Sequence, residues 1–395
     1  MRPVSPRTPK VAFVTDIVTP YMVAVLGALA ERVDLTALFC ARTGTRGADW
    51  SFAEPFGFRH RVLDGPALRR RTPDAADVYP DPQILTALLA DRPDALISGA
   101  FSVPSLFGAL YGRLTGGRMI IHSDGTSHSE RAISGPERLA RSVLLRETAA
   151  CVANSEPAAE RFVELGVDPA RVFRAPHTTN IAPFHAVALG RSPSAATPDG
   201  RVTILHVGRL IPRKGIDRLV HATATAAAEA PVRLLLVGSG PEEERLRGLA
   251  EALGIGPDVE FRGFVDQPGL PSVYAEADVF AFPTLDDPFG IVVLEAAASG
   301  LPIVASPFAG ATLDLVEDGR SGFVVSPDDR DAWARALVTL ARDPALRRRF
   351  GERGHTTTLD RTPERAAAGY EQAVRAALRP PGGVRRRRSA RASVG

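Results

Sequence analysis

Short apolar runs alternate with helix-length segments along most of this 395-residue chain, and no other feature constrains its fold as strongly. A short apolar run between two helices is typical of a parallel strand that is buried on both faces. The pattern occupies both halves of the chain, so we expect two doubly wound α/β units in succession. The strands predicted in this way are Val11 to Thr15, Leu35 to Phe39, Ala95 to Ser98, Met119 to His122, Ala149 to Ala153, Val202 to Val207, Arg233 to Val237, Val259 to Phe261, Val279 to Phe282 and Ile303 to Ala305.

The boundary between the two units is expected in a segment rich in Ser, Pro, Ala and Gly that lacks helical or strand periodicity. We predict one Rossmann-like domain over residues 1–185, a linker over 186–200 and a second Rossmann-like domain over 201–362. A final helix within 363–380 could pack back across the cleft between the domains. The last stretch, 381–395, is rich in arginine and is expected to be disordered.

Cysteine content and hydropathy indicate the cellular compartment in which the protein is expected. The two cysteines, Cys40 and Cys151, each lie in an apolar run, so neither a disulfide framework nor a metal cluster is expected. No apolar stretch of about 18 residues occurs, and Met1 to Lys10 contains three prolines where a signal peptide needs an apolar core. We therefore expect a cytoplasmic protein without a nucleic-acid partner. The arginine-rich tail is either a solvated end or a contact with an anionic surface, which is a nucleic acid or, peripherally, the inner face of a membrane.

The first chemical motif follows the strand that ends at Val207. Gly208 and Arg209 come directly after it, and Lys214 precedes the next helix. Glycine allows close approach of the backbone, and cations at a strand end would face a pyrophosphate. Lys214 is one of only two lysines in the chain, the other being Lys10. The alternative is a solvated basic turn.

A second turn contains Gly238 and Gly240 after the strand ending at Val237. The third glycine of a G-x-G-x-x-G dinucleotide fingerprint would fall at position 243, which is Glu, and three glutamates open the following helix. An NAD-dependent dehydrogenase is therefore disfavoured. The turn either lets the edge of a nucleotide approach the backbone or is simply tight, and the sequence leaves both interpretations open.

The most informative segment reads PTLDDPFGIVVLEAAASGLP, over residues 283–302. Asp287 is expected on the loop and Glu295 inside the helix, so both could point at one ligand from different heights. A glutamate among apolar helix residues is costly to bury without a hydrogen-bonding ligand or a cation. The alternative is a residue on an exposed stripe of the helix.

In order and spacing, the segments GR..RKG, VGSGP and D-x7-E resemble the C-terminal domain of the retaining GT-B glycosyltransferases of family 4, the glycosyl transferases group 1. The resemblance extends from about Val202 to Asp328. It implies a GT-B fold, in which two Rossmann-like domains face each other across a cleft, with the acceptor on the N-terminal domain. The nucleotide diphosphate sugar would bind the C-terminal domain. The implied activity is retaining sugar transfer to a glycan, a lipid-linked molecule or a small molecule.

The resemblance also implies residue roles. Arg209 and Lys214 would bind the donor diphosphate, Glu295 the ribose, and Asp287 the transferred sugar. The family usually has Glu where this chain has Asp287, which leaves the identity of the sugar open. The other residues expected at the donor site are Gly208, Gly238, Gly240, Phe289, Gly290 and Ile291.

The N-terminal half resembles the family less closely. A polar cluster follows the strand 119–122, and a histidine there is similar to one that family members place beside the donor sugar. We therefore assign His122 and Asp124 as catalytic candidates, against the alternative of a satisfied buried histidine. Tyr21 and Trp50 are candidates for stacking on the acceptor, against the alternative of packing in the core or at its rim.

The sequence predicts neither a metal site nor a cofactor. Asp286 and Asp287 are adjacent and do not form the D-x-D pair of metal-dependent transferases, and the cations of Arg209 and Lys214 are available instead. Two rival functions stay open. A nucleotide-sugar epimerase of the same shape would need no acceptor, and a non-catalytic nucleotide-sugar-binding protein would be expected to lack Lys214 or Glu295, both of which are present.

Overall fold

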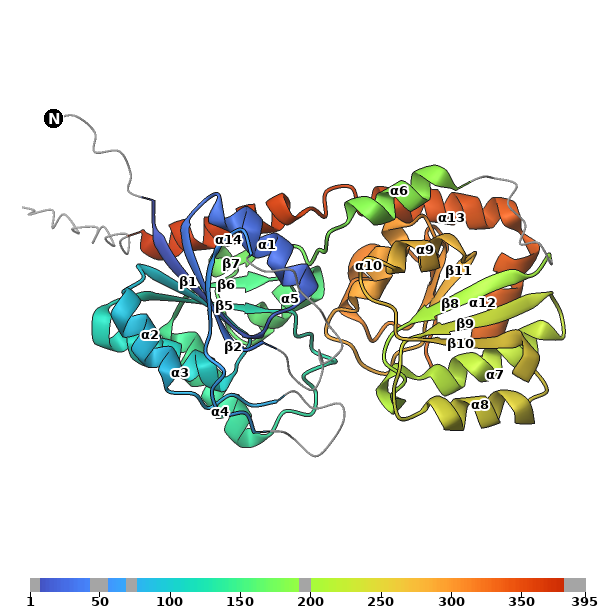
Figure 1. The fold of residues 1–395 in the computed structure, drawn as a ribbon, viewed down its shortest axis with the longest axis horizontal. Coiled ribbons are helices and arrows are strands. Elements are labelled where there is room, and N and C mark those ends of the chain that lie inside the picture. Colours follow the sequence, from blue (N-terminus) through green and yellow to red (C-terminus); the bar gives the residue numbers. More distant parts are fainter. Residues whose placement is uncertain (1–7, 43–55, 69–76, 192–199, 380–395) are drawn as a thin grey trace, which may run out of the picture.

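The computed structural model describes residues 8–42, 56–68, 77–191 and 200–379. Two separate parallel sheets occupy the two halves of the chain, each covered by helices on both faces (Figure 1). The predicted pair of doubly wound α/β units is therefore confirmed. The predicted arginine-rich tail and Trp50 lie outside the described residues.

The first sheet has the strand order β3-β2-β1-β4-β5-β6-β7. Alternate residues of β1 enter two different cores: Val11 and Phe13 pack toward α1 and α14, whereas Ala12 and Val14 pack toward α2 and α3. The sequence pattern missed the two edge strands, β3 and β7. The strands are β1 Lys10–Ile17, β2 Asp34–Ala41, β3 Arg59–Val62, β4 Ala95–Gly99, β5 Arg118–Ser123, β6 Thr148–Ala153 and β7 Val172–Arg174.

The second sheet has the order β10-β9-β8-β11-β12-β13, and its edge strand β13 was also not predicted. In both sheets the order reverses beside the first strand, between β1 and β4 and between β8 and β11. The strands are β8 Val202–Val207, β9 Val232–Val237, β10 Val259–Gly263, β11 Val279–Phe282, β12 Ile303–Ala305 and β13 Gly322–Val324.

Fourteen α-helices cover the sheets within the described parts of the chain, and none of them is both long and apolar enough to cross a membrane. They are α1 Pro20–Ala30, α2 Gln83–Asp91, α3 Val103–Thr115, α4 Gly135–Glu147, α5 Glu156–Glu164, α6 Ala182–Gly190, α7 Ile216–Ala227, α8 Glu243–Ala252, α9 Leu270–Ala275, α10 Ile291–Ala298, α11 Gly310–Leu315, α12 Arg330–Arg342, α13 Pro344–Thr356 and α14 Pro363–Leu378.

The segment predicted as an irregular linker, 186–200, is helical at its start, because α6 continues to Gly190. Residues 192–199 lie outside the described part of the chain. In α6, Phe184 is buried in the second core, which explains why this helix is ordered next to a weakly patterned sequence.

The last helix, α14, packs on the first sheet although it follows the second domain in sequence (Figure 1). It begins after Thr362, whose side chain accepts a hydrogen bond from the Arg365 amide, and Pro363 occupies its first position. Its buried residues recur at helical spacing and face α1 and β5 to β7. These residues are Ala366, Ala367, Gly369, Tyr370, Ala373, Val374 and Ala377. The C-terminal end of the described chain therefore completes the N-terminal core.

Gly369 allows α14 to approach β7 closely, because a Cβ at this position would lie 2.0 Å from the Arg174 carbonyl oxygen. We predict that Gly369→Ala lowers the free energy of unfolding by about 1–3 kcal/mol, since backbone must shift to relieve the overlap. The matched control is Gly248→Ala in α8, where a Cβ meets no atom within 4 Å. That change is expected to stabilise the protein by roughly 0.5–1 kcal/mol. Urea unfolding measures the free energy of unfolding of both variants. A Gly369→Ala protein as stable as the wild type would contradict the close approach of α14 to β7.

Candidate functional site

Ligands of open α/β sheets bind at the carboxyl ends of strands where the strand order reverses, which in the second sheet is between β8 and β11. The loops that follow these two strands contact each other. The Leu285 amide donates to the Arg213 carbonyl at 2.9 Å, and the Thr284 hydroxyl donates to the same carbonyl at 3.2 Å. Two motifs that are distant in the sequence therefore form one surface.

Lys214 and Asp287 form an ion pair on this surface, with side chains that are 12% and 15% exposed. The ammonium nitrogen also lies 5.0 Å from the centre of the Phe282 ring. Burial acts to raise the pKa of Asp287, but the charge and hydrogen bond of Lys214, together with the charge of Arg213 and the Phe289 amide, outweigh it, so this pKa is lowered. The carboxylate is therefore ionised and neutralises Lys214. Lys214, which is predicted to contact the diphosphate, and Asp287, which is predicted to contact the sugar, are therefore partners in one ion pair.

The glycines of the two turns lie where backbone packs against backbone. A Cβ at Gly238 would lie 2.0 Å from the Gly208 carbonyl oxygen, and one at Gly240 would lie 2.3 Å from the Leu210 carbonyl oxygen. Tight packing of the turns therefore explains both Gly238 and Gly240, which is one of the two interpretations that the sequence left open. Arg209 is half-buried in the same turn. Its contact with a diphosphate stays a prediction, as does any backbone contact with a nucleotide.

Glu295 is only 3% exposed, so its interpretation as an exposed stripe residue is wrong. The Tyr274 hydroxyl of α9 donates to Glu295 Oε2 at 2.9 Å, and this is the buried partner that the sequence required but could not identify. Burial raises the pKa of Glu295 to about 7, while the hydrogen bond from Tyr274 acts to lower it. The expected contact with ribose stays a prediction.

The loop before α10 reaches the first domain. Gly290, with φ of 87°, precedes the helix that begins at Ile291. Phe289 is buried, and its ring stacks on the His177 ring with centroids 4.5 Å apart and an interplanar angle of 20°. Because His177 follows β7, Phe289 lies at the contact between the two domains, and Gly290 and Ile291 follow it in the chain.

Two histidines of the first domain contact these loops, and neither was predicted as a site residue. The His177 ring also lies 5.2 Å from the Tyr21 ring, and burial lowers the His177 pKa to about 4, so this ring is neutral. The His128 ring stacks on Phe308 at 4.0 Å, and its Nε2 lies 3.0 Å from the Leu285 carbonyl oxygen. His128 belongs to the polar cluster after β5, which was a usable signal. His177 follows an edge strand that no pattern marked.

The catalytic candidates of the first domain lie at the carboxyl end of β5 and just beyond it. His122 Nδ1 lies 3.4 Å from Asn154 Oδ1 and 3.3 Å from the Tyr370 hydroxyl. Burial lowers the pKa of His122, while the contact with Asn154 and the charge of Asp124 act in the opposite direction. Asp124 therefore lies within electrostatic range of His122, as the sequence order suggested.

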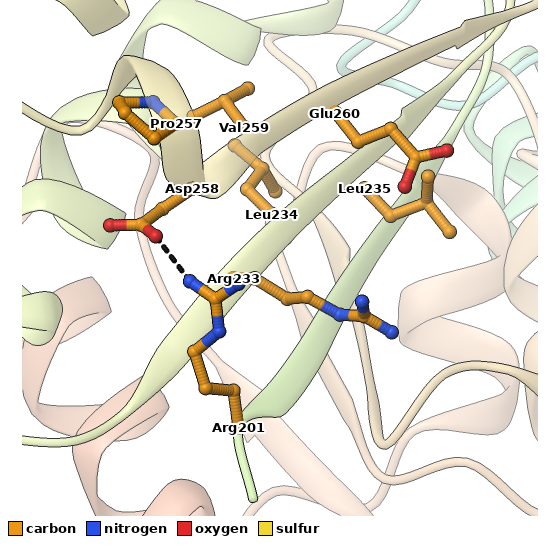
Figure 2. A pocket seen from close by; sticks show the side chains of 8 residues that line it. All are labelled: Arg201, Arg233, Leu234, Leu235, Pro257, Asp258, Val259 and Glu260. Atoms are coloured by element: carbon orange, nitrogen blue, oxygen red, sulfur yellow. Dashed lines mark hydrogen bonds and ion pairs between the residues drawn. The ribbon is translucent and has the colours of Figure 1, made fainter. Parts of the chain in front are cut away.

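A cavity of about 330 Å³ lies at the opposite, amino-terminal edge of the second sheet (Figure 2). Its cationic side chains, Arg201 and Arg233, are matched by Asp258 and Glu260, and Arg201 forms an ion pair with Asp258. The lining residues labelled in Figure 2 belong to the starts of β9 and β10 and to the segments before β8 and β10, whereas Gly208 and Gly238 follow the ends of β8 and β9. This balance of charge offers nothing specific to an anionic donor, so the cavity is not the candidate site.

Comparison with known proteins is consistent with these motifs. A family model described as Glycosyl transferases group 1 matches residues 192–357. The lipopolysaccharide core biosynthesis glycosyltransferase LpsE of Rhizobium meliloti (strain 1021) is 33% identical over 226 residues, which are 57% of this chain and 62% of the relative. The GDP-mannose-dependent alpha-(1-6)-phosphatidylinositol monomannoside mannosyltransferase of Mycolicibacterium smegmatis is 38% identical over 168 residues, 40% of this chain and 44% of the relative. The chain thus spans less than two thirds of these curated relatives.

A solved structure shares the fold over almost the whole chain. Anabaena Alr3699/HepE in complex with UDP and glucose has a TM-score of 0.71 and 19% sequence identity, covering 93% of this chain and 99% of that chain. The predicted GT-B fold is therefore confirmed. The matched segment, residues 192–357, belongs to the glycosyl transferases group 1 family, as its motifs predicted.

The buried Glu295 carboxyl predicts a specific pH dependence. Because its pKa in the folded protein lies above its ordinary value of 4.5, folding favours the protonated form. The contribution of Glu295 to the free energy of unfolding is fully present below about pH 4.5 and is lost as the pH rises toward 7. Glu295→Gln keeps an acceptor for Tyr274 without this titration, so the variant should gain about 3 kcal/mol relative to wild type across that window.

Urea unfolding of the two proteins at a series of pH values measures this difference. Glu251→Gln, at an exposed position of α8, is the matched control for the loss of one carboxylate. A stability difference between Glu295→Gln and wild type that does not change with pH would mean that Glu295 is not buried as described.

Proposed function

We propose that this protein, whose residues 192–357 belong to the glycosyl transferases group 1 family, transfers a sugar from a nucleoside diphosphate to an acceptor. The transfer proceeds with retention of configuration and without a metal ion. The observation that carries the proposal is the Lys214–Asp287 ion pair at the strand-order reversal of the second sheet. In this pair, Lys214 provides a cation for the diphosphate, and Asp287 provides a carboxylate for the adjacent sugar.

Departure of the nucleoside diphosphate develops negative charge on its β-phosphate, and catalysis needs fixed positive charge at that position. In the proposed site Arg209 and Lys214 supply this charge in place of a metal ion. Asp287 accepts a hydrogen bond from a hydroxyl of the transferred sugar. Glu295, whose carboxylate is oriented by Tyr274, accepts from the hydroxyls of the ribose. The contacts of Arg209, Lys214 and Asp287 are supported by their positions after the carboxyl ends of β8 and β11, and that of Glu295 by its place on α10, which follows the same loop as Asp287.

The nature of the donor is supported by the proteins that this chain resembles. The Anabaena structure holds UDP and glucose, and the Mycolicibacterium relative is described as GDP-mannose-dependent. We therefore propose a nucleoside diphosphate hexose as donor. Asp287, one methylene shorter than the glutamate usual at this position, is the residue expected to select among hexoses. A thermal-shift panel of UDP- and GDP-sugars would identify the donor, since a specific ligand raises the unfolding temperature.

The acceptor is proposed to bind the first domain beside the ring column of Tyr21, His177 and Phe289, which joins the two domains. In retaining transfer without a protein nucleophile, the departing phosphate assists deprotonation of the acceptor hydroxyl. His122 and Asp124 lie on the same domain and are the proposed catalytic contacts to the sugar.

A lipid-linked acceptor at an anionic membrane is favoured by one surface of the first domain. Leu106, Leu110 and Leu114 recur every four residues on α3 and are 43%, 42% and 62% exposed. The other face of α3 packs on the first sheet. The neighbouring helix α4 adds exposed Leu139 and Arg138, so apolar and cationic side chains lie together, as an interfacial surface requires. Comparing free sugars with sugar lipids in anionic vesicles as acceptors tests this choice.

We predict that Lys214→Met reduces transfer a hundredfold or more, about 2.7 kcal/mol, and weakens binding of the bare nucleoside diphosphate. The matched control is Lys10→Met, which removes the only other lysine, itself paired with Asp91 at 2.8 Å on the first domain. Lys10→Met should leave both quantities unchanged. Transfer is measured in excess EDTA, where the wild type should stay active because protein cations replace a metal.

Product analysis in the same assay separates the rival functions. Formation of a glycosylated acceptor supports transfer, whereas an epimerised nucleotide sugar without acceptor indicates an epimerase. Binding without any product indicates a non-catalytic protein. A folded Lys214→Met protein with wild-type kinetics, or wild-type activity that EDTA abolishes and Mg²⁺ restores, would contradict the proposed site.

A further inference from the structure

His122 is enclosed by groups from several parts of the chain. It pairs with Gly99 of β4 and Val152 of β6 in the sheet register, and its ring lies 5.3 Å from the Phe13 ring. The Tyr370 ring from α14 meets it edge to face at 5.9 Å. A ring enclosed in this way has a fixed plane, so its two nitrogens have fixed and different surroundings.

The orientation of the Asn154 amide follows from its own contacts. Its Nδ2 donates to the Ala175 carbonyl oxygen at 3.0 Å, and a carbonyl can only accept. The amide oxygen therefore points the other way, to within 3.4 Å of His122 Nδ1. Because an amide oxygen is also only an acceptor, this contact favours the tautomer with the proton on Nδ1.

Tyr370 closes this network from the last helix. Asn154 Nδ2 also lies 3.3 Å from the Tyr370 hydroxyl, which in turn lies 3.3 Å from His122 Nδ1. With the proton on Nδ1, the hydroxyl oxygen can accept from both Asn154 Nδ2 and His122 Nδ1, so its position is compatible with the amide orientation and with this tautomer. Tyr370 is buried with the first core, so its hydroxyl position depends on the packing of α14.

The second ring nitrogen of His122, Nε2, has different surroundings from Nδ1. Nε2 is buried, and no hydrogen-bond partner for it occurs among the described residues. It faces Gly99, where a Cβ would lie 3.1 Å away. Burial lowers the pKa of His122; Asn154 and Asp124 oppose this, and His177 reinforces it. A neutral ring with its proton on Nδ1 has a lone pair on Nε2, which can accept a hydrogen bond from a hydroxyl group.

We propose that Asn154 and Tyr370 are positioning residues that hold His122 with its proton on Nδ1, so that Nε2 accepts a hydrogen bond from a hydroxyl of the sugar substrate. This inference rests on the proposed function, since it names how one site residue meets that substrate. The last helix then has a role in the site of the first domain as well as in its core. Without α14 on the sheet, the first core would lose packing, and the Tyr370 hydroxyl would no longer help to hold the His122 proton on Nδ1.

The tautomer can be measured without any substrate. In full-length protein labelled with ¹⁵N-histidine, His122→Gln assigns the signals of His122, and the two ring nitrogens are distinguished by their chemical shifts. We expect a neutral ring with the proton on Nδ1 at neutral pH. Asn154→Leu and Tyr370→Phe should each shift the tautomer population toward the proton on Nε2. A wild-type proton on Nε2, or a population that neither variant changes, overturns the proposal.

Kinetics test the consequence for transfer. Tyr370→Phe, which keeps the ring and its packing, should lower kcat about tenfold with little change in the KM for the donor. Tyr111→Phe is the matched control, because the Tyr111 hydroxyl is also buried and donates to the Pro93 carbonyl at 2.7 Å, away from His122. Equal losses in the two variants would make the effect structural and overturn the proposal.

A pH profile adds a readout that packing alone would not change. Asn154→Asp places a carboxylate beside His122 in addition to Asp124, which should raise the His122 pKa and protonate Nε2 in the neutral range. Transfer by this variant should fall at neutral pH and recover as the pH rises, while a pH-independent loss counts against the proposal. If the wild type transfers no sugar, the proposed function and the sugar contact fail, and the tautomer measurement still decides whether Asn154 and Tyr370 position His122.

Discussion

The rest of the site depends on the contact between the loops that follow β8 and β11. The Lys214–Asp287 ion pair stabilises this contact. Strand order reverses between these strands, so the two following loops leave the sheet side by side. The Asp287 amide donates to the Phe308 carbonyl at 2.9 Å, and Asp287 Oδ1 accepts from the Phe289 amide at 3.2 Å. One carboxylate thereby fixes a loop, neutralises a lysine and faces the proposed sugar position.

The same loops determine how the two domains meet. The Leu285 carbonyl, Phe289 and Phe308 are contacted by histidines from the first domain. A separate contact involves Asp314 of α11, which accepts from the Glu156 amide at 3.0 Å and from Arg361 Nη1 at 2.6 Å. Together with α14, which packs on the first sheet, these contacts join the two domains.

The predictable part of the structure was the part encoded in local patterns. Ten strands and the motifs around Lys214 and Glu295 have sequence signals, whereas β3, β7 and β13 are edge strands of only three or four residues. Tyr274 could not be identified as the partner of Glu295, because the two lie on different helices. The pairing of Lys214 with Asp287 and the contacts of His177 likewise depend on tertiary packing. Gly238 illustrates a motif that the sequence left open: packing against the Gly208 backbone accounts for the glycine, and its contact with a nucleotide stays a prediction.

The central claim is that Lys214 serves the diphosphate while Asp287 serves the sugar, although the two are ion-paired. Calorimetry of the bare nucleoside diphosphate with Asp287→Asn, alongside a transfer assay, tests it most directly. Asn keeps an oxygen for the Phe289 amide but releases Lys214. The account predicts diphosphate affinity equal to or tighter than wild type together with a loss of transfer of a hundredfold or more. Diphosphate affinity that falls as far as it does in Lys214→Met would contradict this division of roles.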